Sequence, residues 1–118
     1  MNEIREQFPL LWQLFGGYFH QDWMVVHRDE DAAIRTFVFD GDAEEAYRSV
    51  TQLDNFLALG LTEQELEHAM HVDLSCEYDP EPDGRTMTYW LRWVRDTLAK
   101  YAAEKAGQEN PVSSVKRD

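Results

Sequence analysis

Apolar positions recur every three or four residues along most of the chain, which is the spacing of amphipathic helices. The first such stretch lies between Phe8 and Trp23, and Pro9 suits its first helical position. Its side chains are apolar on most sides, so we expect a helix that is buried at the centre of the fold. Gly16 and Gly17 lower helix stability there, which predicts either close approach by a neighbouring helix or the end of the helix. The predicted stripe consists of Phe8, Leu11, Trp12, Phe15, Tyr18 and Phe19, with Leu10 and Leu14 on another side.

Four further segments show the same spacing, and each follows a residue that can cap a helix. They are expected at about 30–39, 43–57, 63–71 and 87–106, after Asp29, Asp42, Thr62 and either Thr86 or Thr88. Residues 1–7 read as a polar lead-in, and no run of alternating β-strands is present. The sequence therefore predicts an all-α fold, a single compact bundle of about five helices over residues 1–106. Residues 107–118 are expected to form a mobile C-terminal tail after Gly107.

The spacing also predicts which side of each helix faces the core. The expected inner faces are Ala33, Ile34, Phe37 and Val38, then Ala43, Ala46, Tyr47, Val50, Leu53 and Leu57, and finally Met87, Trp90, Leu91, Val94, Leu98, Tyr101 and Ala102. Tyr89 and Trp93 are expected to widen the last stripe.

The charge of the chain is unevenly placed. The net charge is −12, whereas residues 29–83 alone carry −14, with 16 acidic and two basic residues. Nucleic acid and anionic membrane surfaces are bound through cations, so this balance disfavours both as partners. The natural complement is a basic protein surface, although acidity could also serve only to keep the domain in solution.

The most concentrated acidity lies in a loop at 74–84 that two prolines stiffen and keep from forming a helix. Like charges held together cost stability unless a cation or a partner neutralises them. The spacing does not match an EF-hand calcium loop, which leaves a partner as the better interpretation. The carboxylates of this loop are Glu77, Asp79, Glu81 and Asp83.

Candidate chemistry is sparse. His68 and His71 share a helix face, and His20, His27, Asp73 and Cys76 are further potential metal ligands. Their spacing matches no zinc motif, and solvated or partner-contacting histidines are the simpler interpretation. Cys76 with a histidine could form a nucleophile, but a lone cysteine is more often a small packing residue. No glycine loop for phosphate is present, so we expect no catalytic residue, metal, cofactor or small-molecule substrate.

Two local features remain. The polar corner His20–Asp22 is either a partner contact or, as we expect, a structural turn with Trp23 packed beneath the first helix. Cys76 is the only cysteine, and neither an 18-residue apolar run nor a secretory signal is found, so we expect a cytoplasmic protein.

Several strings of the sequence resemble the CdiI-type immunity proteins of bacterial contact-dependent growth inhibition systems. The most specific is Leu14–Trp23 (LFGGYFHQDW), which follows Pro9–Leu11 (PLL). Weaker matches follow in the right order, and together they cover about Phe8 to Leu98. They are Leu59–Glu63 (LGLTE), Cys76–Pro80 (CEYDP), Gly84 and Thr88–Trp93 (TYWLRW).

The resemblance implies a function that composition alone does not. Such proteins stay in the cytoplasm of the producing cell and neutralise the C-terminal toxin domain, often a nuclease, that a neighbouring cell delivers. The motif residues Gly16, Gly17, Tyr18, Trp23, Trp90 and Trp93 read as determinants of the fold. Specific recognition is more easily tailored on exposed loops and helix faces, which gives our predicted partner contacts. These are Asp40, Asp42, Glu44, Glu77, Asp79, Glu81 and Asp83.

Two other functions remain open at this stage. One is a small acidic regulatory or adaptor protein with a different basic protein partner. The other is a metal-dependent or hydrolytic enzyme, which stoichiometric zinc in the purified protein would support.

Overall fold

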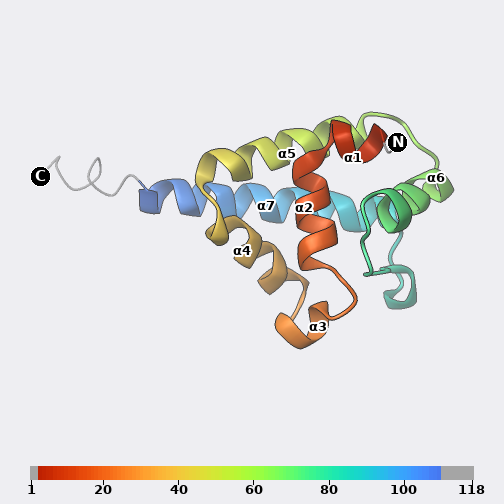
Figure 1. The fold of residues 1–118 in the computed structure, drawn as a ribbon, viewed down its shortest axis with the longest axis horizontal. Coiled ribbons are helices and arrows are strands. Elements are labelled where there is room, and N and C mark those ends of the chain that lie inside the picture. The colour runs from red at the N-terminus through yellow and green to blue at the C-terminus, as the bar shows by residue number, and fades with distance from the viewer. Residues whose placement is uncertain (1–2, 110–118) are drawn as a thin grey trace, which may run out of the picture.

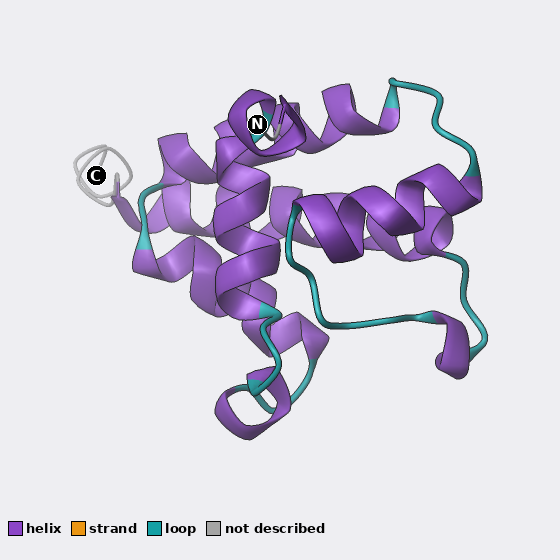
Figure 2. Ribbon diagram, turned by 45° about the vertical axis from the view of Figure 1, so that its right-hand side comes forward, coloured by secondary structure: helices purple, strands orange, loops and turns teal. Residues whose placement is uncertain are grey.

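The computed structural model describes residues 3–109, and in that range it contains helices and loops without any strand. Figures 1 and 2 show the arrangement, which confirms the expected all-α fold. The elements are α1 (Glu3–Gln7), α2 (Pro9–Tyr18), α3 (Trp23–Val26), α4 (Glu30–Asp40), α5 (Ala43–Leu57), α6 (Glu63–His68), a π-helical turn (Ala69–Asp73), a 3₁₀ turn (Glu81–Asp83) and α7 (Met87–Glu109).

The five expected helices are present as α2, α4, α5, α6 and α7. Two short helices add to them, α1 in the expected polar lead-in and α3 in the brief apolar run at 23–26. Helix α1 is held because Ile4 packs on the core and Arg5 donates a 2.8 Å hydrogen bond to the Asp73 carbonyl. At the other end, α7 continues through Gly107 to Glu109, past the predicted end near Ala106. Residues 110–118 of the predicted tail lie outside the described residues.

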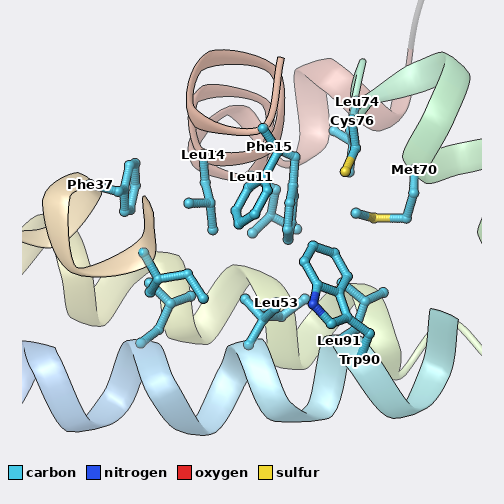
Figure 3. Close-up of a cluster of buried hydrophobic side chains, with 14 of the residues drawn as sticks. Leu11, Leu14, Phe15, Phe37, Leu53, Met70, Leu74, Cys76, Trp90 and Leu91 are labelled. Carbon is cyan, nitrogen blue, oxygen red and sulfur yellow. The ribbon is translucent and has the colours of Figure 1, made fainter. Parts of the chain in front are cut away.

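Helices α5 and α7 lie antiparallel and make the most extensive helix–helix contact of the described fold (Figure 1). Helix α2 crosses them and also contacts α4, and its Leu11, Leu14 and Phe15 are fully buried. In Figure 3, Phe15 lies over Trp90 of α7, and the two ring centroids are 5.8 Å apart. The expectation that α2 is buried is therefore correct, although the most extensive helix–helix contact in the described fold is between α5 and α7.

The predicted inner faces of α4 and α7 are buried, but that of α5 is partly wrong. Tyr47 is 45% exposed, and Phe56 is buried at the last turn where Leu57 was expected. The Phe56 ring meets that of Phe8 edge-on at 5.3 Å, and Leu57 is half-buried against the core. Trp12 of α2 is also 43% exposed, beneath the guanidinium of Arg5.

The caps follow the sequence closely. The carboxylates of Asp29 and Asp42 accept from the third backbone N–H of their helices, and Thr62 with Glu65 forms a complete capping box. At α7 the cap is Thr86 rather than Thr88, because the Thr86 hydroxyl accepts from the Tyr89 N–H at 3.0 Å. These local bonds satisfy backbone donors that the first turn of a helix leaves without partners.

Of the two adjacent glycines in α2, Gly16 lies where another part of the chain approaches closely. A β-carbon at Gly16 would lie 3.1 Å from the carbonyl oxygen of Leu74, so the close approach is made by a loop rather than by a helix. A β-carbon at Gly17 would meet nothing within 4 Å. Among the described helices, none is long and apolar enough to cross a membrane.

Candidate functional site

The acidic residues predicted to contact a partner are all exposed, but they form two separate groups. One group lies at the corner between α4 and α5, beside the end of α7, where the Glu109 carboxylate accepts from the Ala43 N–H at 3.1 Å. The other lies in the loop that leads into the start of α7 (Figure 1). Because α7 has 23 residues, about 34 Å separates its two ends. The structure therefore does not bring the seven carboxylates into one patch.

Two carboxylates of the α4–α5 corner have structural partners. Asp40 accepts a 2.6 Å hydrogen bond from the Tyr18 hydroxyl, and Asp42 caps α5 through a 2.8 Å bond from the Glu45 N–H. The Glu44 side chain makes no bond with the part of the chain that the structure describes. Two of the three predicted contacts at this corner therefore have a structural role.

The acidic loop, defined here as residues 77–83, is pinned to the body of the protein at alternate positions. Tyr78 and Pro80 are buried, whereas Glu77, Asp79 and Glu81 face solvent. The Glu77 N–H donates to the Phe19 carbonyl at 2.8 Å, which fixes the loop beside the end of α2. The loop thus holds its carboxylates outward on a fixed backbone.

The carboxylates of the acidic loop differ in their partners. Asp79 accepts from the Glu81 N–H at 3.0 Å, and Asp83 accepts from the Tyr78 hydroxyl at 2.6 Å. The side chains of Glu77 and Glu81 make no hydrogen bond or ion pair with any residue from 3 to 109. Within the acidic loop, these two carboxylates are therefore the ones available to a partner without breaking a bond to residues 3–109.

A polar cluster beneath the acidic loop ties it to two helices. Glu30 at the start of α4 accepts 3.0 and 3.1 Å hydrogen bonds from Arg85 and a 2.7 Å bond from the Trp90 indole. Arg85 also donates to the Tyr78 hydroxyl. The Tyr78 ring packs at 4.8 Å from Trp90 and at 5.5 Å from Trp23. Loop, α3, α4 and α7 are thus joined at one point.

An apolar turn lies beside this cluster. In α3, Met24, Val25 and Val26 are 73%, 86% and 63% exposed, whereas Trp23 on one side and His27 on the other are buried. In both Figure 1 and Figure 2, α3 and the 3₁₀ turn of the acidic loop project from the lower edge of the molecule. We did not predict this exposed turn, although the run of four apolar residues from Trp23 to Val26, between Asp22 and His27, could have indicated it.

Tyr89 of α7 is exposed, contrary to the prediction from the sequence. It was expected in the buried stripe of α7 but is 62% exposed, beside a surface hollow of about 480 Å³ lined by Gly84, Arg85, Thr86 and Tyr89 itself. Trp93, one turn later, is half-buried and lines a hollow with residues 29–31 at the start of α4. Because α4 begins there, it leaves Tyr89 uncovered.

The residues considered for metal or nucleophilic chemistry do not converge. Among residues 3–109, no group of three histidine, cysteine or acidic side chains could hold a metal ion. His71 Nδ1 lies 2.9 Å from the Cys76 carbonyl, the Asp22 N–H donates to His20 Nδ1 at 3.1 Å, and His27 stacks on Tyr18 at 5.8 Å. Residues His20–Asp22 form a turn, and Trp23 is buried as expected.

Burial also decides the state of the single cysteine. The Cys76 thiol is 1% exposed, and burial raises its pKa to about 12. A thiol that keeps its proton is a poor nucleophile, so this position favours the packing role.

Three tyrosine hydroxyls donate to aspartates, namely Tyr18 to Asp40, Tyr78 to Asp83 and Tyr101 to Asp31. Burial and the Asp40 bond raise the pKa of Tyr18 to about 12, and the Asp31 bond followed by burial raises that of Tyr101 to about 12. The folded protein holds these protons more tightly than the unfolded chain does, where the tyrosine pKa is 10.0. The contribution of the Tyr18 and Tyr101 hydrogen bonds to stability is therefore complete below pH 10 and is lost between pH 10 and about 12.

We expect urea unfolding followed by circular dichroism to show this loss of stability over the same pH range. The variant Tyr18→Phe/Tyr101→Phe should be less stable than the wild type at pH 8 and should lose less stability on going to high pH. Equal losses in the two proteins would contradict the assignment.

Comparison with known proteins adds the final observation. The family model described as "CdiI immunity protein" matches residues 7–98. The solved structures include a similar chain in the crystal structure of a CdiA-CT/CdiI complex from Y. kristensenii 33638. It is 26% identical, the match covers 78% of this chain and 98% of that one, and the TM-score is 0.73. No curated protein sequence matches.

Proposed function

Because the chain belongs to the CdiI immunity protein family, we propose that it binds and neutralises the toxin domain of a cognate contact-dependent growth inhibition system. The observation that carries this proposal is the family match over residues 7–98, which takes in α2 to α6 and half of α7. The similar chain in a CdiA-CT/CdiI complex supports it, because that structure pairs an immunity protein with a toxin domain.

The toxin that we propose is a nuclease with a basic surface. A nuclease must present cations to its substrate, and an inhibitor of net charge −12 complements such a surface. Glu77 and Glu81 support this interpretation because they project from a fixed loop and make no hydrogen bond or ion pair with the described residues. The α4–α5 corner is the weaker candidate, since Asp40 and Asp42 already have partners.

The role proposed is inhibition by binding, in the cytoplasm of the producing cell, where a delivered nuclease would meet its substrate. It requires no catalytic residue, cofactor or small-molecule substrate in this chain. The alternative is an acidic regulatory or adaptor protein that uses the same loop for a different basic protein.

The test is co-expression of the full chain with the C-terminal domain of the very large secreted protein that we expect to be encoded immediately upstream. We expect growth to be restored and the two proteins to elute as one complex. Continued toxicity together with separate elution would reject this function and favour the adaptor alternative.

The proposed electrostatic attraction also predicts how fast the complex forms. We expect the association rate constant, measured by stopped-flow fluorescence, to fall by about 10-fold or more between 50 and 500 mM NaCl, because salt screens charges beyond a few ångströms. The dissociation rate should change much less. An association rate that is independent of salt would argue against an acidic interface.

A further inference from the structure

We propose that the exposed apolar turn Met24–Val26 is the anchor of this interface and enters an apolar recess on the toxin domain that is bordered by lysines or arginines. The proposal rests on the function proposed above and adds to it the surface and the chemistry of the partner. The acidic loop provides the charged border of the same interface.

In the free protein, this turn exposes contiguous apolar side chains to water. Three consecutive apolar side chains stand more than 60% exposed, and Val25 reaches 86%. Contiguous exposed apolar surface bordered by polar residues is typical of interaction sites rather than of ordinary protein surface.

Contacts at both ends of the turn hold it outward. Trp23 packs at 5.3 Å from Phe19 and at 5.5 Å from Tyr78, and His27 stacks on Tyr18. The His27 N–H closes the turn on the Trp23 carbonyl at 2.7 Å. With both ends anchored in the core, the backbone of the turn is already ordered, so binding would lose little backbone entropy.

The apolar turn also adjoins the acidic loop that carries Glu77 and Glu81. Trp23, the first residue of α3, contacts Tyr78, which lies directly between Glu77 and Asp79. An apolar centre with a charged border is the usual anatomy of a protein interface. Because that border is negative, the recess that receives the turn should be surrounded by cations.

The test compares the full-length variants Val25→Lys and Val25→Glu, by calorimetric titration with the toxin domain of the co-expression test proposed above. Truncating an anchor side chain, or replacing it with a charged one, typically weakens binding by tenfold or more. A like charge on the partner adds to that loss. We therefore expect the dissociation constant to rise about 10-fold for Val25→Glu and about 100-fold for Val25→Lys, because lysine would face the cations of the toxin.

Val72→Lys is the matched control, since Val72 is 54% exposed in the π-helical turn and lies outside the proposed interface. It should change the dissociation constant by less than about threefold, as expected for a residue outside an interface. Because Val25 is so exposed, its variants should keep the melting temperature of the wild type.

Equal affinities of Val25→Lys and Val72→Lys would overturn the anchor, and weaker binding by Val25→Glu than by Val25→Lys would overturn the cationic border. Both results leave the immunity function standing, provided that the wild type binds the toxin. A wild-type dimer that Val25→Lys dissociates would assign the turn to a second copy of this chain and would also overturn the proposal.

Discussion

The variant Trp90→Ala is expected to lose about 3–5 kcal/mol of unfolding free energy, the usual cost of truncating a buried tryptophan. Trp90 is fully buried, and its ring lies within 6 Å of Phe15, Phe19 and Tyr78. The substitution leaves a cavity at the junction of α2, α7 and the acidic loop. It also removes the indole that donates to Glu30 at 2.7 Å.

Urea unfolding of the wild type and of Trp90→Ala at pH 7 measures this difference in unfolding free energy. Tyr89→Ala is the matched control, because it removes a neighbouring aromatic side chain that is 62% exposed on the same helix. It should change the unfolding free energy by less than about 1 kcal/mol, as most surface substitutions do. Similar losses at Trp90 and Tyr89 would show that the core is not centred on Trp90.

The second large effect is expected on binding. Reversing both unpaired carboxylates in Glu77→Lys/Glu81→Lys should raise the dissociation constant for the toxin domain about 1,000-fold, because each lysine would face a cation across the interface. Neither side chain bonds to another residue within 3–109, so the melting temperature should stay within a few degrees of that of the wild type. Asp79 and Asp83 are less suitable targets, because they stabilise the loop itself.

A control with the same change in net charge separates a local contact from a general field. Glu44→Lys/Glu104→Lys reverses two exposed carboxylates near the far end of α7, where Glu104 makes a solvent-exposed ion pair with Arg35 at 3.5 Å. Exposed pairs of this kind contribute little to stability. We expect at most about a 10-fold loss of affinity, from long-range attraction alone. If both pairs weakened binding equally, the acidic loop would have no special role.

The sequence predicted the helices that have strong periodicity and good caps. The inner face of α4 matched residue by residue, and the capping box at Thr62 and Glu65 formed as expected. These features depend on neighbours within about four positions, which the chain order contains directly. The predictions were wrong where burial depended on distant elements: Tyr47 is exposed, and Phe56, which packs on Phe8, is buried although it was not expected to be.

The candidate site was predictable only in part. Its carboxylates were recognisable because prolines space and expose them. Their supports were not, because Glu30 lies 55 positions from Arg85 and 60 from Trp90. No local pattern reports such a pairing, and the apolar turn at Met24–Val26 could have been read as core until its anchors at Trp23 and His27 were located.

By itself, the sequence of this protein determined an acidic, all-helical chain, the capping of its helices and most of its core positions. Those properties follow from composition and from the spacing of close neighbours. Only the tertiary structure decided that the carboxylates form two groups at opposite ends of α7, and that just one group lies beside an exposed apolar turn. The reason is that the packing of α2, α5 and α7 sets distances between residues far apart in the chain, and an interface depends on those distances.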